Sequence, residues 1–138
     1  MSNSLALVIE DNRDLALIFA EAVRFASMEV EVIRDGEAAL QRLRECVPAL
    51  VILDLHLPGV SGKDLLAFIK SDSRLAATQI VIASADGVLV DELRDQVDLA
   101  LEKPVGFEQL RTLAIRLQFQ RKASRDNHNA NGQSASVG

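Results

Sequence analysis

Residues 50–59 read LVILDLHLPG, an apolar run that ends in an aspartate and a Pro-Gly loop. Four consecutive apolar residues, Leu50–Leu53, are typical of a strand that is buried on both faces. Asp54 follows this strand directly, and Pro58-Gly59 marks a rigid turn. Strands of this kind occur in parallel sheets whose two faces are covered by helices, so the segment predicts an α/β fold.

Three further apolar runs are each followed closely by polar residues that can do chemistry. The runs are Leu5–Ile9, Ile80–Ala83 and Leu99–Leu101, and the polar pieces are Glu10-Asp11, Ser84 and Lys103-Pro104. In open parallel sheets ligands bind at the carboxyl edge of the strands. We therefore expect three carboxylates, a hydroxyl and an ammonium group in one pocket, which suits a divalent cation and a phosphoryl group.

The segments between these runs carry helical spacing, and one more strand is predicted near an edge of the sheet. The alternating strand is Val30–Ile33, and helices are predicted over Arg13–Ala26, from Asp35-Gly36 to about Glu45, around Leu65–Ile69, over Val88–Val97 and along Phe107–Leu117. The apolar stripes of the first and last helices are Leu15, Ile18, Phe19, Ala22 and Val23, and Phe107, Leu110, Leu113, Ala114 and Leu117. Because each parallel crossover needs a covering helix, five strand–helix units predict a doubly wound sheet.

The composition favours a single soluble domain. The chain has 138 residues, of which about half are apolar, and its net charge of −5 argues against a nucleic-acid partner. No apolar run approaches the roughly 20 residues of a membrane span, and the N-terminus lacks a signal-peptide pattern. The single cysteine, Cys46, cannot form an internal disulfide, so we expect a reducing cytoplasm and a small apolar role near a helix end.

The C-terminal residues differ in composition from the rest of the chain. Residues 121–138 are rich in Ser, Asn and Gly and offer almost nothing to bury, so we expect a disordered polar tail after a domain over residues 4–120. The tail is too short for a second domain. We therefore expect a stand-alone domain without an output module.

Over about residues 4–120 the chain resembles the CheY-like receiver domains of response regulators, which act in bacterial two-component signalling. The resemblance rests on Glu10-Asp11, on Asp54 to Gly59 with Gly62 behind it, on Ser84-Ala85 and on Lys103-Pro104. Each piece is weak evidence alone, but all of them occur in order and at strand ends. The resemblance implies a flavodoxin-like sheet of order 2-1-3-4-5 with five helices, a phosphoacceptor aspartate, Mg²⁺-dependent transfer from a histidine kinase or phosphotransfer protein, and a conformational switch.

The chemistry can also be argued from the residues. A carboxylate can attack phosphorus and carry the phosphoryl group as an acyl phosphate, and Asp54 is the best placed to do so. The approach of one anion to another needs a cation, and hard oxygen ligands select Mg²⁺. We expect Asp11 and Asp54 to supply two of its oxygens, Glu10 to act through a water, and His56 to add its backbone carbonyl.

The remaining site residues have supporting roles. Lys103 brings a positive charge to a phosphoryl oxygen, and the Ser84 hydroxyl can donate a hydrogen bond to another. The resemblance implies that the bond before Pro104 is cis. We expect the His56 side chain to be exposed at the rim, where it and Asp86 tune slow self-hydrolysis of the acyl phosphate. The chain is thus expected to be a phosphoacceptor signalling domain and not an enzyme.

Two residues depart from the family pattern. Ala100 stands where many receivers carry Tyr or Phe, so the aromatic half of the usual switch is absent, and Ser84 stands where Thr is commoner. We expect phosphorylation to pull Ser84 inward and to shift the loop with Ala85 and Asp86. The signal is expected to leave by contact with a downstream protein, with a homodimer also open. The expected face comprises Val88–Val97, Leu99–Leu101 and Phe107–Leu117.

Several alternatives stay open at this point. Asp11 could cap the first helix, Ser84 could cap a later one, and Lys103 could be a surface lysine. The domain could be an interaction module whose phosphorylation has lapsed. A haloacid-dehalogenase-like phosphatase usually has a second carboxylate, the general acid, two residues after its nucleophile, and this chain has His56 there. An FMN site would need Ser, Thr and Gly in the loop that here reads Glu10–Asp14.

Overall fold

Five parallel strands form a single sheet in the computed structural model, which describes residues 4–117. The strands are β1 (Leu5–Ile9), β2 (Glu29–Ile33), β3 (Leu50–Asp54), β4 (Gln79–Ser84) and β5 (Leu99–Glu102). Their order in the sheet is β2-β1-β3-β4-β5, as the family resemblance implied. All five residues of the central β3 are buried, whereas β2 lies at an edge and is partly exposed. The doubly wound parallel sheet is therefore confirmed.

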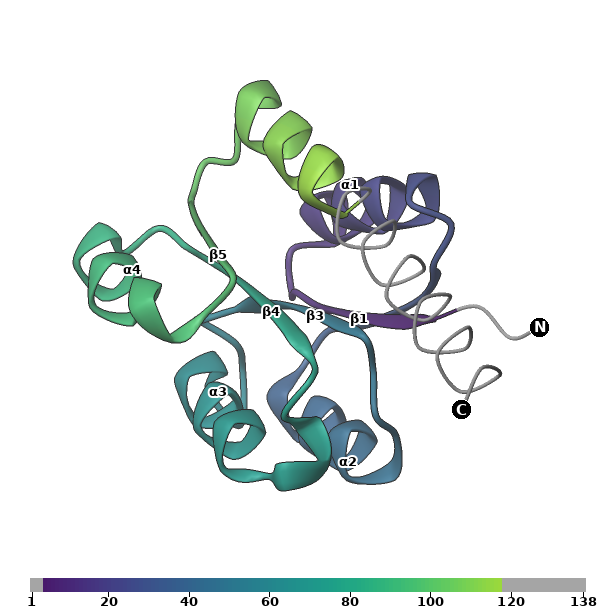
Figure 1. Cartoon of the computed structure of the whole chain (residues 1–138). Coiled ribbons are helices and arrows are strands. Elements are labelled where there is room, and N and C mark those ends of the chain that lie inside the picture. Colours follow the sequence, from purple (N-terminus) through teal and green to yellow (C-terminus); the bar gives the residue numbers. More distant parts are fainter. Residues whose placement is uncertain (1–3, 118–138) are drawn as a thin grey trace, which may run out of the picture.

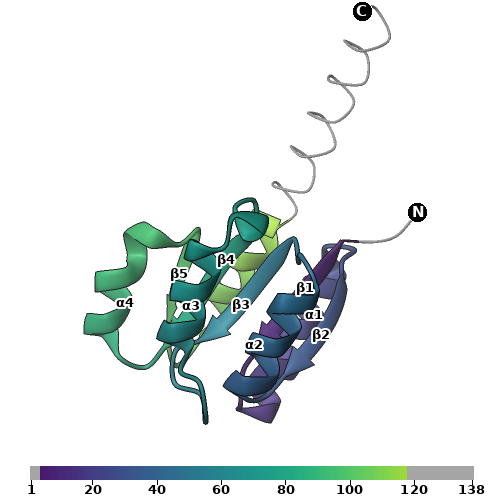
Figure 2. The ribbon, with the colours of Figure 1, turned by 90° about the horizontal axis from the view of Figure 1, so that it is seen from below.

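Helices cover both faces of this sheet. They are α1 (Arg13–Phe25), α2 (Gly36–Glu45), α3 (Gly62–Ser71), α4 (Gly87–Leu93) and a fifth helix over residues 107–117, with short 3₁₀ turns η1 (Ser73–Leu75) and η2 (Arg94–Gln96). Figures 1 and 2 show α1 and the fifth helix on one face, with α2 and α3 on the other. Because both faces are covered, only the ends of the strands are left as places for a site.

The core consists of two apolar clusters, one on each face of the sheet. Alternate residues of a strand point to opposite faces, so Leu7 of β1 belongs to the cluster under α2 and α3, while Val8 belongs to the cluster under α1 and the fifth helix. Both residues are fully buried. Cys46 follows α2 as its C-cap and packs against the first cluster, which confirms its expected apolar role.

The buried face of α1 does not coincide with the apolar stripe listed from the sequence. Ala16, Phe19, Ala20 and Val23 face the sheet, whereas Ile18 is 46% exposed. Two apolar stripes run along this helix, and the packing against the sheet and the fifth helix selects the one with the small alanines. The predicted helix is thus confirmed, and Ile18 lies on the side that faces away from the sheet.

Two features at the C-terminal half also differ from the prediction. Phe107 is 77% exposed because it lies in the first turn of the fifth helix, ahead of the buried Leu113 and Leu117. The helix predicted over Val88–Val97 ends at Leu93 and tightens into η2, a common way for a helix to end before a strand.

The predicted tail over residues 121–138 lies outside the described residues, and the domain limit at residue 120 lies there too. Within residues 4–117, no helix is long and apolar enough to cross a membrane.

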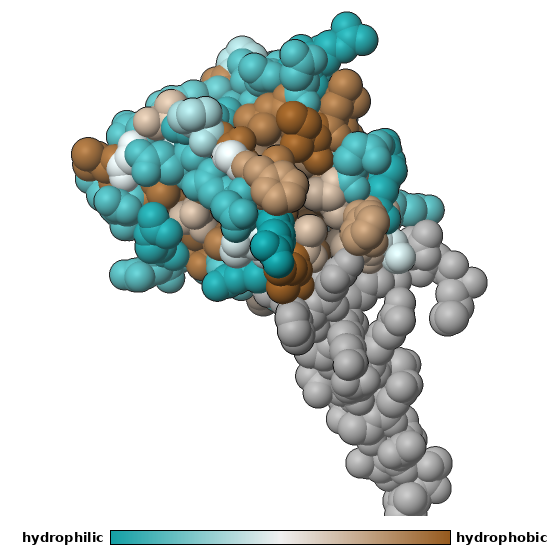
Figure 3. Space-filling model, turned by 90° about the horizontal axis from the view of Figure 1, so that it is seen from above, coloured by the Kyte–Doolittle hydropathy of each residue, from teal (hydrophilic) through white to brown (hydrophobic). Residues whose placement is uncertain are grey.

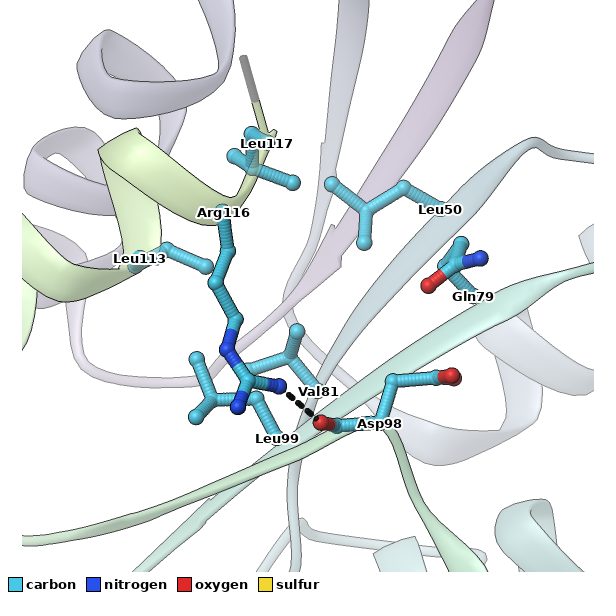
Figure 4. Close-up of a pocket in the computed structure, with 8 residues that line it drawn as sticks. All are labelled: Leu50, Gln79, Val81, Asp98, Leu99, Leu113, Arg116 and Leu117. Carbon is cyan, nitrogen blue, oxygen red and sulfur yellow. Dashed lines mark hydrogen bonds between the residues drawn. The ribbon is translucent and has the colours of Figure 1, made fainter. Parts of the chain in front are cut away.

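A small cavity opens at the amino edge of the sheet (Figure 4). It has a volume of about 10 Å³, room for a single water molecule, and Arg116 donates a hydrogen bond from Nη1 to the Asp98 carbonyl at 2.6 Å across it. The first residues of β3, β4 and β5 line it, so it lies at the edge opposite to Asp54. The cavity is therefore separate from the predicted site.

Candidate functional site

The carboxyl edge of the sheet brings three carboxylates together. Glu10 and Asp11 follow β1 and Asp54 ends β3, and these two strands are paired neighbours. One oxygen from each residue lies within 4.8 Å of the others. Glu10 and Asp54 are buried while Asp11 is exposed. Buried carboxylates this close repel one another, so the site requires positive charge.

Lys103, which follows the edge strand β5, supplies part of that charge. Its Nζ lies 2.8 Å from Glu10 Oε1 and 3.3 Å from Asp54 Oδ1. Its backbone N–H donates to the Ser84 carbonyl at 2.8 Å, and the bond to Pro104 is cis, as the resemblance implied. Burial alone would lower the pKa of Lys103, but the Glu10 and Asp54 carboxylates hold it above its ordinary value. The surface-lysine alternative is therefore wrong.

Glu10 remains short of stabilising partners. Burial raises the pKa of Glu10 to about 7, with Lys103 opposing this rise and Asp54 adding to it. Its Oε2 accepts a hydrogen bond from Asn12 N at 3.1 Å, and its Oε1 is paired with Lys103 Nζ at 2.8 Å. A hydrated divalent cation fits this donor set, because one lysine faces three carboxylates and Mg²⁺ prefers hard oxygen ligands.

The backbone around Asp54 is fixed by the loop that follows it. His56 N donates to Asp54 Oδ1 at 3.0 Å, and the His56 side chain is exposed, as predicted. Gly62 lies so close to the Asp54 peptide that an added Cβ would collide with the Asp54 carbonyl. The glycine is therefore required for steric reasons directly behind the candidate nucleophile.

Asp11 is free of the capping role that was its alternative. Asn12 caps α1 instead, since its Oδ1 accepts a hydrogen bond from Leu15 N at 3.0 Å. Arg34 donates from Nη2 to the Asp11 carbonyl at 2.9 Å. The sequence prediction missed Arg34, although its position directly after β2 places it at the same edge of the sheet.

The segment after β4 forms the rim of the site. Ser84 is fully buried, and its Oγ accepts a hydrogen bond from Asp86 N at 3.0 Å. Asp86 caps α4 by accepting from Leu89 N at 3.1 Å, so the alternative that Ser84 caps this helix is wrong. Ala85 and Asp86 are exposed. Ser84 reaches Lys103 through the backbone hydrogen bond described above.

The two remaining predicted residues lie on and after β5. Ala100 is half-buried, is paired with Ile82 of β4 and, like Leu89, packs against the apolar cluster under α2 and α3. Pro104 is exposed at the end of the strand. The position that carries Tyr or Phe in many receivers therefore holds only a methyl group, as predicted.

Comparison with known proteins identifies the family. The family profile of the response regulator receiver domain matches residues 6–115. The chain belongs to this family. Receivers are signalling domains, which sets aside the phosphatase and FMN-binding alternatives.

Relatives of the receiver extend the comparison. It is 34% identical over 118 residues to the probable methanogenesis regulatory protein FilR2 of Methanothrix harundinacea, covering 78% of this chain and 76% of that protein. It is 33% identical to the DNA-binding response regulator MtrA of Mycolicibacterium paratuberculosis over 71% of this chain. The receiver spans only 44% of MtrA.

Solved structures show the same fold. The receiver matches the bacteriophytochrome response regulator RtBRR with a TM-score of 0.69 and 30% identity, covering 86% of this chain and 78% of that one. A CheY-like receiver domain from Methylobacillus flagellatus gives a TM-score of 0.69 at 25% identity, covering 84% and 99% of the two chains. The comparisons thus establish the receiver fold, and the structure places an acidic cluster at its carboxyl edge.

Proposed function

We propose that Asp54 accepts a phosphoryl group from a histidine kinase or a phosphotransfer protein in the cytoplasm. One observation carries the proposal: the buried Asp54 carboxylate lies 3.3 Å from Lys103 Nζ and beside Glu10 and Asp11. A structural aspartate would need one cationic partner. This arrangement instead gathers more negative charge than the lysine neutralises, which favours a cation and a phosphoryl group as further occupants.

The chain's own residues account for the transfer step. The contacts from Lys103 and His56 N fall on Asp54 Oδ1, so Oδ2 is the oxygen that attacks. The new O–P bond forms as the P–N bond to the donor histidine breaks, and the electron pair leaves with the imidazole. Lys103 then holds a phosphoryl oxygen by charge.

A magnesium ion would neutralise charge on the phosphoryl group during this step. Asp11, Asp54 and the backbone carbonyl of His56 would hold it, and Glu10 would act through a water. Hard oxygen ligands of this kind suit Mg²⁺, which usually keeps several of its waters.

The proposed switch begins at Ser84. Its hydroxyl now accepts a hydrogen bond from Asp86 N, and in the phosphorylated protein it would donate one to a phosphoryl oxygen. This exchange would move the loop that starts α4, with Ala100 offering no ring to follow it. Val88 on α4 is 71% exposed and Phe107 is 77% exposed, so a downstream protein or a second copy of the chain would find apolar contacts on this face.

A second apolar surface is available for the phosphodonor protein. Figure 3 shows apolar side chains gathered over α1 and the fifth helix. Besides Phe107, which also belongs to the first surface, the exposed large apolar residues of these two helices are Leu17, Ile18, Phe25 and Ile115. Because Asn12 caps α1 and directly follows Asp11, a protein lying along this helix would reach Asp54. We therefore place the donor here.

One observation favours the alternative of an interaction module that is no longer phosphorylated. Ala100 removes the aromatic half of the usual switch, as expected for a domain that no longer changes shape on phosphorylation. The complete set of Glu10, Asp11, Asp54, Ser84 and Lys103 argues for an active site. A lapsed site would not respond to Mg²⁺, whereas an active one would.

The proposal is tested by incubation with acetyl phosphate, with and without Mg²⁺, followed by intact-mass measurement. The expected result is a gain of one phosphoryl mass that requires both Mg²⁺ and Asp54, with Asp54→Asn as the matched variant. Phosphohistidine donors are tried in parallel, since a small donor need not fit every receiver. Folded protein that gains no mass from either donor would favour the lapsed-receiver alternative.

A further inference from the structure

We propose that Arg34 is a positioning residue of the metal site, which holds the backbone of Asp11 so that its carboxylate faces the cation. This inference rests on the proposed function, because it assigns a role toward the Mg²⁺ of that site. Arg34 itself contacts a backbone carbonyl and none of the three clustered carboxylates by a hydrogen bond or ion pair within residues 4–117.

The peptide between Asp11 and Asn12 is held from both sides. Its carbonyl accepts from Arg34 Nη2 at 2.9 Å, and its N–H donates to Glu10 Oε2 at 3.1 Å. A peptide unit bonded at both its oxygen and its hydrogen has little freedom to rotate. The Asp11 Cα belongs to this unit, so the two bonds hold the atom from which the exposed Asp11 side chain leaves the backbone.

Arg34 is attached to a rigid part of the fold, although its side chain is exposed. On one side, Ile33 ends β2 and its carbonyl accepts from Glu10 N at 3.0 Å. On the other side, Gly36 lies so close to Val60 that an added Cβ would collide with the Val60 carbonyl. The backbone that carries Arg34 is therefore held in place beside the Asp11 loop.

Charge and positioning make opposite predictions for Arg34. As a cation near a cation site, Arg34 repels Mg²⁺, so removing its charge alone would tighten Mg²⁺ binding. As a positioning residue, its removal would free the Asp11 peptide and weaken Mg²⁺ binding. The sign of the change in affinity therefore separates the two roles.

The experiment measures the Mg²⁺ dissociation constant by titration calorimetry for the wild type, Arg34→Met, Arg34→Lys and Arg116→Met. The control is matched, because Arg116 is also exposed and also donates to a carbonyl, at the opposite edge of the sheet. We expect Arg34→Met to raise the dissociation constant roughly tenfold, as removal of an outer partner of a metal ligand typically does. Arg34→Lys should recover part of the loss, and Arg116→Met should match the wild type.

A kinetic readout accompanies the titration. In Arg34→Met the Mg²⁺ concentration for half-maximal acetyl phosphate uptake should rise, while the rate at saturating Mg²⁺ should return to the wild-type value. An unchanged or lower dissociation constant in Arg34→Met would overturn the inference, as would an equal loss in Arg116→Met. Absence of Mg²⁺ binding in the wild type would instead remove the proposed function and this inference together.

Discussion

Lys103 Nζ lies 2.8 Å from Glu10 Oε1, so an ammonium group from β5 reaches the end of β1 across the ends of β4 and β3. The two residues follow strands that share no hydrogen bonds in the sheet. Asp54, at the end of β3, lies between them and is 3.3 Å from the same nitrogen. The lysine thereby forms ion pairs with two buried carboxylates at the carboxyl edge of the sheet.

The first prediction concerns this lysine. Lys103→Met should lower the free energy of unfolding at pH 8, without Mg²⁺, by about 2 kcal/mol, because it leaves Glu10 and Asp54 buried without their cation. The loss should shrink near pH 6, where Glu10 takes up a proton. Since the chain has no Trp or Tyr, urea unfolding is followed by circular dichroism. Lys70→Met, an exposed lysine on α3, is the control, and an equal loss there would contradict the account.

The second prediction follows from the raised pKa of Glu10. Its carboxyl has a pKa of about 7 in the folded protein and 4.5 ordinarily, so between these values the folded state binds the extra proton. The resulting stability is complete below pH 4.5 and is lost as the pH rises through 7. In Glu10→Gln the side chain does not ionise, so this loss of stability with rising pH should be absent.

The measurement compares unfolding free energies of the two proteins from about pH 5 to pH 8 without Mg²⁺. The advantage of Glu10→Gln should grow with pH, to at most about 3 kcal/mol. Saturating Mg²⁺ should reverse the trend in the wild type, because the cation favours the ionised carboxyl. Parallel pH profiles for the two proteins would refute the assignment.

The third prediction concerns Gly62. Gly62→Ala should lower the free energy of unfolding by roughly 3 kcal/mol and slow phosphoryl uptake, because the new Cβ would collide with the Asp54 carbonyl. Gly106→Ala is the matched control, since nothing lies within 4 Å of a Cβ added there. It should change stability by less than about 0.5 kcal/mol. Similar effects of both variants would argue against a steric role for Gly62.

The fourth prediction separates the two roles of Asp86. Asp86→Asn keeps a good capping residue for α4 and removes the charge beside the site, whereas Asp86→Ala removes both. If the charge contacts the attacking water, both variants should change the rate at which the acyl phosphate hydrolyses. Only Asp86→Ala should lower stability, by about 1 kcal/mol. An unchanged hydrolysis rate in Asp86→Asn would remove this residue from the account.

The fifth prediction tests the route of the signal. Ser84→Ala should weaken the dependence of partner binding on phosphorylation. The variant has no hydroxyl that could give up the hydrogen bond from Asp86 N and donate one to a phosphoryl oxygen instead. The measurement is partner affinity with and without phosphorylation, in the wild type and the variant. Binding that stays fully phosphorylation-dependent in the variant would exclude a route through Ser84.

Most of the sheet and of the site could be predicted because strands buried on both faces are continuous apolar runs. The runs before Glu10, Asp54 and Ser84 correspond to β1, β3 and β4 within a residue. Parallel strands place their carboxyl ends at one edge, so the clustering of these residues followed from the topology.

Other features depend on tertiary contacts that a sequence pattern does not contain. The two apolar stripes of α1 are both at helical spacing, and only packing decides that Phe19 is buried and Ile18 is not. The bond from Arg34 to the Asp11 carbonyl joins residues 23 positions apart. No local propensity predicts such a contact.

Locating the phosphoryl group tests the central claim most directly. After incubation with a phosphodonor and Mg²⁺, borohydride reduction converts an aspartyl phosphate to homoserine, and peptide mass analysis finds the converted residue. The account predicts conversion at Asp54 alone and none when Mg²⁺ is chelated. Conversion at another carboxylate, such as Asp11, or conversion that does not depend on Mg²⁺, would contradict it.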